Sequence, residues 1–208
     1  MSEDLVADDI RIAKTLPSRF YHDSEIFDTL MSLFEGWQFA AHQSEFNTNT
    51  ILPLDHIESV TGEPTILINE NNVICLSNIC THRGMRLVSE ACKRKTLLCE
   101  YHGRTFETNG KLKHMPEFEQ AIDFPGDSDN LFSLGLKSWK GMHFVSRKDL
   151  DYIPWEEVAS RFDFLDIESY SHDPNRDRDH SISANWMLYV DNYLEGFHIP
   201  FVHPELNQ

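Results

Sequence analysis

The pattern of apolar and polar residues changes twice along the chain. After a polar stretch over residues 1–20, residues 23–25 have the composition of a helix N-terminus. The apolar side chains that follow are spaced to lie on one helix face, at Ile26, Leu30 and Phe34. Gly36 is a residue type that ends helices. The pattern therefore predicts a mobile arm over residues 1–20, followed by a helix that begins near residue 23.

Between residues 37 and 145, apolar residues occur in short runs separated by turn residues. The polar segment 69–72 and the segment Thr108-Asn109-Gly110 each lie between two such runs and predict hairpins. The predicted strands are 65–68, 73–76, 104–106, 111–112, 134–137 and 143–145. Strands this short and regular indicate a small antiparallel β domain.

Helical patterns return after residue 146. Residues 152–165 predict a helix that begins near Pro154, and a charged loop follows over residues 173–180. Residues 181–208 carry apolar side chains at a spacing that predicts a further helix. These changes divide the chain into three parts, residues 1–36, 37–145 and 146–208.

Composition narrows the classes of function. The 208 residues are enough for one or two domains. A formal net charge of −16, from 34 acidic and 18 basic residues, argues against nucleic acid or an anionic membrane as a partner. No apolar stretch reaches the roughly 18 residues of a transmembrane helix, and the N-terminus lacks the basic and apolar regions of a signal peptide. We therefore expect no membrane span and no membrane or nucleic-acid partner.

Two short motifs combine cysteine with histidine. Cys80 and His82 form a C-x-H motif, and Cys99 and His102 form a C-x-x-H motif after sixteen intervening residues. Two thiolates and two imidazoles suit a [2Fe–2S] cluster with cysteines on one iron and histidines on the other. Structural zinc is the alternative, although zinc modules usually keep the two cysteines together and the two histidines together. The mixed motifs resemble those of the Rieske family, which implies a [2Fe–2S] cluster bound by these four residues.

The positions of the remaining cysteines indicate which branch of the Rieske family the chain resembles. Rieske proteins of respiratory complexes have an extra disulfide whose cysteines would fall at Met85 and Tyr101, so that disulfide is absent here. Cys75 lies in an apolar run and is predicted to be a buried thiol. Cys92 lies among basic residues and is predicted to be on an exposed loop. The chain therefore resembles the oxygenase or ferredoxin branch, in a cytoplasmic setting.

A second motif lies near the end of the sequence. Residues 185–204, with Glu195 ahead of His198 and His203, resemble the mononuclear-iron motif of Rieske non-heme iron oxygenases. The resemblance implies that both histidines belong to a 2-His-1-carboxylate triad on Fe(II), which leaves open positions for O2 and substrate. Their i, i+5 spacing does not place them on one face of a regular helix, and Pro200 predicts a break between them.

Glu195 has two interpretations. In the resembling family, an acidic residue at this point bridges a cluster histidine of a neighbouring subunit to an iron histidine. Most members have Asp, and Glu occurs in a subset similar to the quaternary-ammonium oxygenases. This interpretation implies a catalytic role for Glu195 in electron transfer and a homo-oligomer, which we expect to be a trimer. The alternative is a solvated helix carboxylate.

The resemblance implies an α+β fold, in which a small antiparallel β Rieske domain precedes the start of a helix-grip catalytic domain. It also implies a Rieske-type mono- or dioxygenase that takes electrons from a reductase, directly or through a ferredoxin, and uses O2 to hydroxylate an aromatic or quaternary ammonium substrate. Family members are much longer, with the third iron ligand downstream, so the chain is expected to be a truncated N-terminal portion that holds the cluster without turning over. The alternative is a Rieske electron-transfer protein without oxygenase activity.

Overall fold

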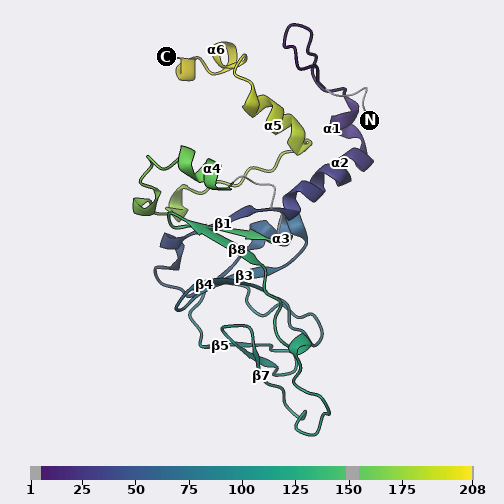
Figure 1. Ribbon diagram of the computed structural model, residues 1–208, viewed down its shortest axis with the longest axis vertical. Coiled ribbons are helices and arrows are strands. Elements are labelled where there is room, and N and C mark those ends of the chain that lie inside the picture. The colour runs from purple at the N-terminus through teal and green to yellow at the C-terminus, as the bar shows by residue number, and fades with distance from the viewer. Residues whose placement is uncertain (1–5, 149–154, 208) are drawn as a thin grey trace. The chain divides into compact units, whose positions relative to one another are not determined.

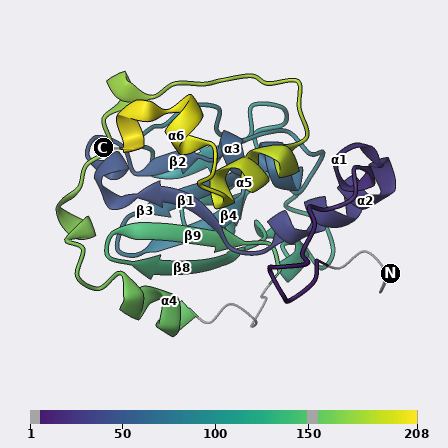
Figure 2. The same ribbon diagram turned by 90° about the horizontal axis from the view of Figure 1, so that it is seen from above.

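The computed structural model describes residues 6–148 and 155–207, which form two compact units (Figures 1 and 2). The larger unit is Leu33–Asn175, and the smaller unit combines Met1–Ser32 with Arg176–Gln208. All three antiparallel sheets lie in the larger unit, and the regular elements described in the smaller unit are helices. This arrangement confirms the expected α+β class.

The larger unit contains three sheets of three antiparallel strands each. The first has the order β1-β9-β8, at Gln38–His42, Met142–Ser146 and Gly135–Trp139. The second has the order β2-β3-β4, at Ile51–Pro53, Thr65–Asn69 and Val73–Ser77. The third has the order β5-β6-β7, at Thr96–Leu98, Thr105–Glu107 and Leu112–His114. Figure 1 shows the second sheet between the other two.

Strand β3 is buried on both faces. Ile66 and Ile68 belong to a core that reaches the third sheet at Phe106. Leu67, between them in sequence, belongs to a second core that reaches the first sheet at Val145. Successive side chains of a strand point to opposite faces, so three consecutive apolar residues supply both cores. The uninterrupted apolar run in the sequence is therefore the composition that a strand between two cores requires.

The two predicted hairpins are confirmed. Strands β3 and β4 pair with Asn69 opposite Val73, and β6 and β7 are joined by a turn in which Gly110 has a φ of +87°. A Cβ atom at Gly110 would lie 3.2 Å from the Leu76 side chain, so packing and backbone conformation both favour glycine there. Strands β8 and β9 correspond to the predicted strands at 134–137 and 143–145.

The larger unit also contains helices. Helix α3 (Asp55–Thr61) connects β2 to β3, and the sequence pattern gave no indication of it because Ile57 is its one buried residue. Gly62 ends the helix with a φ of +69°. Helix α4 (Trp155–Arg161) lies within the predicted helix 152–165, of which residues 152–154 are outside the described residues. Its short 3₁₀ helices are η2 (Gln43–Phe46), η3 (Asp127–Asp129) and η4 (Ile167–Ser169). The 3₁₀ helices η1 (Ser32–Glu35) and η5 (Pro174–Arg176) each include one residue of the smaller unit.

The smaller unit contains α1 (Arg19–His22), α2 (Ser24–Met31), α5 (Trp186–Leu194), α6 (Ile199–Val202) and the 3₁₀ helix η6 (Pro204–Asn207). The predicted helix near residue 23 is confirmed, because the Asp23 carboxylate accepts the N–H of Glu25 at 2.9 Å and caps α2.

The prediction of an arm over residues 1–20 is wrong for the last residues of that range. Helix α1 begins at Arg19, and the Tyr21 phenol donates to the Asp191 carboxylate of α5. Residues 1–5 of that arm lie outside the described residues.

Among the helices of residues 6–148 and 155–207, none is both long enough and apolar enough to cross a membrane.

Replacement of Leu67 by alanine tests the two-sided burial of β3. Leu67 is fully buried, so Leu67→Ala is expected to lower the free energy of unfolding by about 2–5 kcal/mol through lost contacts and a cavity. Urea unfolding followed by circular dichroism measures the change. Leu33→Ala, at a side chain that is 56% exposed, is the matched control and should change stability by less than about 0.5 kcal/mol. Equal effects in the two variants would contradict this assignment of the core.

Candidate metal centre

Two loops of the larger unit have the same main-chain hydrogen bonds. In loop 1 (residues 79–86), which follows β4, the Cys80 N–H donates to Met85 O at 2.8 Å and the Gly84 N–H donates to Cys80 O at 3.0 Å. Gly84 has a φ of +73°, a left-handed conformation that glycine adopts without strain. The loop is thereby folded into a compact turn around its cysteine.

Loop 2 (residues 99–104) joins β5 to β6 and repeats this arrangement at the same offsets. The Cys99 N–H donates to Arg104 O at 2.8 Å, and the Gly103 N–H donates to Cys99 O at 3.0 Å. Gly103 has a φ of +77°. The two C-x-H-type motifs of the sequence therefore fold into two equivalent turns.

The thiols of the two loops meet in the core between the second and third sheets. Cys80 and Cys99 are each 2% exposed. Burial is the largest influence on the Cys80 thiol and raises its pKa, the His82 N–H opposes the rise, and the Cys99 side chain adds to it. Burial therefore disfavours a free thiolate here, and a bound cation is the usual compensation for a thiolate in such surroundings.

The imidazoles of the two loops also lie together. The ring centroids of His82 and His102 are 4.7 Å apart at an interplanar angle of 61°. Nδ1 of His82 is buried without a hydrogen-bond partner. Burial, followed by the charges of His102, Arg104 and Arg83, lowers the pKa of His82. A buried, neutral and unpaired imidazole nitrogen is the state in which histidine binds a metal.

The four candidate ligands fall into two pairs, the thiols of Cys80 and Cys99 and the imidazoles of His82 and His102. A Cys2His2 zinc site needs four donors around one ion, whereas a Rieske cluster needs a thiolate pair on one iron and an imidazole pair on the other. The paired thiols and paired imidazoles therefore fit a [2Fe–2S] cluster.

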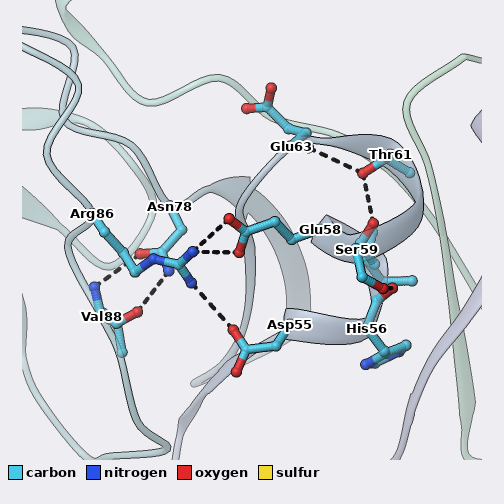
Figure 3. A network of polar contacts seen from close by, with 10 residues as sticks. Asp55, His56, Glu58, Ser59, Thr61, Glu63, Asn78, Arg86 and Val88 are labelled. Atoms are coloured by element: carbon cyan, nitrogen blue, oxygen red, sulfur yellow. Dashed lines mark hydrogen bonds and ion pairs between the residues drawn. The ribbon is translucent and has the colours of Figure 1, made fainter. Parts of the chain in front are cut away.

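Buried polar contacts close the base of loop 1. The Asn78 side chain is fully buried, donates from Nδ2 to Val88 O at 2.7 Å and accepts the Val88 N–H at 2.9 Å. Figure 3 shows this reciprocal pair beside Arg86, whose guanidinium binds Asp55 at 3.2 Å and the Glu58 carboxylate, both on α3. Sequence reasoning missed Asn78, because a single asparagine before the motif has no local signal of a partner ten residues away.

The other two cysteines lie outside loops 1 and 2. Cys75 is buried, as predicted, and burial raises its pKa to about 12. The prediction that Cys92 lies on an exposed loop is wrong. Cys92 is partly buried against the core because its backbone pairs with Ile51 of β2 at 3.0 Å.

In the smaller unit, His198 and His203 lie at the two ends of the short helix α6. Their ring centroids are 5.4 Å apart. The predicted break at Pro200 is wrong, because the chain leaves α5 in an extended conformation at Glu195, before His198. Pro200 lies in the first turn of α6, where its missing N–H removes no hydrogen bond.

Glu195 contacts His198 directly. Nδ1 of His198 donates to Oε1 of Glu195, and the Phe197 N–H donates to Oε2 at 2.5 Å. The His198 hydrogen bond is the largest cause that lowers the pKa of Glu195. Because an ionised carboxylate only accepts hydrogen bonds, the proton is on Nδ1 of His198 and Nε2 is left to act as a metal ligand.

Comparison with known proteins assigns both parts of the chain. Residues 36–139 match the Rieske [2Fe-2S] domain family, and residues 163–208 match the ring hydroxylating alpha subunit family in its catalytic domain. The expected start of a catalytic domain after the β domain is thereby confirmed.

Individual relatives agree with these matches. The carnitine monooxygenase oxygenase subunit of Escherichia coli (strain K12) is 29% identical over 92% of this chain and 53% of its own length. The 2-halobenzoate 1,2-dioxygenase large subunit of Burkholderia cepacia is 26% identical over 88% of this chain and 42% of its own length. A crystal structure of a quaternary ammonium Rieske monooxygenase is similar with a TM-score of 0.79 and 25% identity, over 94% of this chain and 56% of that chain. The chain therefore spans about half the length of the curated relatives it matches.

Removal of the Asn78 amide tests the scaffold of loop 1. Asn78→Ala leaves the buried N–H and C=O of Val88 unpaired, so the free energy of unfolding is expected to fall by about 2 kcal/mol or more. Urea unfolding measures this change. Asn72→Ala, at an exposed residue of the β3–β4 hairpin, is the control and should change little. A stability for Asn78→Ala equal to that of the control would show that the buried pair does not hold the loop.

Proposed function

The chain belongs to the family of Rieske oxygenase α subunits. We propose that it is part of the terminal oxygenase component of a Rieske non-heme iron system. In this proposal Cys80, His82, Cys99 and His102 hold a [2Fe–2S] cluster. The observation that carries it is the meeting of two buried thiols and two facing imidazoles on loops with matched hydrogen bonds. When bound, such a cluster supplies electron transfer one electron at a time.

The proposed cysteine ligands are buried, whereas His102 is exposed. Cys80 and Cys99 are in the core, where their thiolates are shielded from water. His102 is exposed, and the ring of Tyr101, itself 57% exposed, lies over it with centroids 3.8 Å apart. Electrons from a reductase, directly or through a ferredoxin, therefore have their shortest approach at the exposed tip of loop 2.

His198 and His203 are proposed as two ligands of a mononuclear Fe(II) that activates O2. The hydrogen bond from His198 to Glu195 supports this role, because a carboxylate behind a ligating histidine fixes its tautomer and ring orientation. In the family, the carboxylate ligand of the triad lies well downstream of the histidines. Glu195 is further proposed to link His198 to a cluster histidine of a neighbouring subunit, in a homo-oligomer that we expect to be a trimer.

The proposed substrate is a small organic compound that the enzyme hydroxylates. Glu at residue 195 resembles the quaternary-ammonium subset of the family, and the E. coli relative is named as a carnitine monooxygenase subunit. We therefore favour a quaternary ammonium compound over an aromatic ring. The dioxygenase relative of similar identity makes an aromatic substrate the competing hypothesis.

Metal and sulfide analysis of anaerobically purified protein tests the cluster. An iron-to-sulfide ratio of about one is expected if the chain holds the [2Fe–2S] cluster alone, and about one and a half if the two histidines also hold Fe(II). Cys99→Ala should remove the labile sulfide. Cys92→Ala, at a cysteine away from the loops, should keep it. Zinc without labile sulfide in the unmodified chain would overturn the proposal.

Replacement of Glu195 tests the proposed electron route. Glu195→Gln keeps the size of the side chain but removes its charge, so it weakens the hydrogen bond from Nδ1 of His198 to the residue 195 side chain. In the complete enzyme, the reduced protein should be reoxidised by O2 roughly tenfold or more slowly, with reduction by the donor unchanged. Stopped-flow absorbance measures both rates. Glu205→Gln, at an exposed carboxylate, is the control, and unchanged reoxidation in Glu195→Gln would exclude the route.

A further inference from the structure

Arg104 is a buried cation two residues after His102, the second proposed histidine ligand. Its side chain is 3% exposed. Arginine is almost never fully buried unless it is paired. Neither the cluster motif nor the main-chain hydrogen bond of Arg104 to Cys99 requires a charged side chain at this position, so the charge calls for its own explanation.

The guanidinium joins loop 2 to loop 1. Nη1 of Arg104 donates to the Thr81 hydroxyl at 2.7 Å, and Thr81 lies between Cys80 and His82 in loop 1. The main-chain oxygen of Arg104 accepts the Cys99 N–H at 2.8 Å. One residue thus contacts both loops that carry the proposed ligands.

Arg104 also joins the loops to a third segment, residues 117–130, named here the cover segment. Nη2 of Arg104 binds the Asp129 carboxylate at 3.2 Å, and the Thr81 hydroxyl donates to Asp129 O at 2.7 Å. The guanidinium lies 5.5 Å from the ring centroid of Phe124. In the same segment Phe118 packs on Phe124, with centroids 4.9 Å apart.

The cover segment reaches one of the proposed ligands. The Phe118 ring lies edge-on to His82, with centroids 6.3 Å apart. Contacts therefore run from His82 through Phe118 and Phe124 to Arg104, and back to loop 1 through Thr81. The guanidinium is thus built into the packing around the site.

The charge of Arg104 is only partly compensated. Asp129, its carboxylate partner, is 22% exposed and also accepts the Gly126 N–H at 2.9 Å. Nε of Arg104 is buried without a hydrogen-bond partner. A buried ion pair with an unsatisfied donor adds little net stability, so stability alone does not account for a cation here.

We propose that Arg104 is a positioning residue for the cluster and that its buried charge, set against Asp129, raises the reduction potential of the site. This inference rests on the proposed function, because it requires a [2Fe–2S] cluster on the two loops. The reduced cluster carries one more negative charge than the oxidised cluster, so a nearby cation stabilises the reduced form. The interaction is strong because the guanidinium is shielded from water.

The test is a potentiometric titration of the full chain, with dithionite as reductant, followed by visible circular dichroism and electron paramagnetic resonance. Arg104→Met should lower the midpoint potential, because it removes the cation and leaves the Asp129 carboxylate uncompensated. Asp129→Asn should raise it, because it removes the anion and leaves the cation. Arg104→Lys keeps the charge but loses the paired contacts of the guanidinium to Thr81 and Asp129. Its midpoint potential should lie between those of Arg104→Met and the unmodified chain.

Arg83→Met is the matched control. Arg83 adjoins His82 in sequence but is exposed, so water screens its charge and the potential should shift less than in Arg104→Met. Opposite shifts for Arg104→Met and Asp129→Asn support the inference. The inference is overturned if both variants keep their labile sulfide and their midpoint potentials shift in the same direction or do not shift. Arg104 and Asp129 would then have a structural role only.

The iron and sulfide contents separate this inference from the proposed function. An unmodified chain without labile sulfide overturns the proposed function, and the inference falls with it. An unmodified chain with sulfide but without opposite shifts overturns the inference alone. If Arg104→Met does not fold, Asp129→Asn and Arg104→Lys decide the outcome.

Discussion

The burial of strand β3 on both faces is the constraint from which the rest of the larger unit follows. Ile66 and Ile68 serve one core while Leu67 serves the other. A slip of one residue in the register would exchange the two sets, so the pairing of β3 with β2 and β4 is firmly specified. Loop 1 begins two residues after β4 ends at Ser77, so the sheet fixes where the loop starts.

The site then depends on bringing together two loops from different sheets. Loop 1 follows the second sheet and loop 2 lies within the third, yet Cys80 and Cys99 share one core. Apolar packing alone does not set the distances that metal ligands need. Directional contacts supply that precision: Asn78 closes the base of loop 1, and Arg104 spans the gap to Thr81. Both side chains are buried, where hydrogen bonds are strong and costly to leave unmade.

The sequence predicted the features whose partners are close along the chain. Each half of the cluster motif is local, and so are the hairpins around residues 69–72 and 108–110. Asn78 and Arg104 escaped prediction because their partners lie ten to twenty-five residues away and neither belongs to a periodic pattern. The break predicted at Pro200 was wrong for a different reason. Proline breaks a helix in its interior but is tolerated in a first turn, and the sequence does not state which turn it occupies.

The smaller unit orients its candidate ligand by local means. Glu195 and His198 are three residues apart, and the extended backbone at Glu195 lets Oε1 accept from His198 while Oε2 accepts the Phe197 N–H. The orientation of His198 therefore needs no partner subunit. A carboxylate oxygen has two lone pairs, so Oε2 can accept a second donor without releasing Phe197. Glu195 thus combines a fixed contact inside its own chain with the capacity for one more, which is the property that a link between two histidines requires.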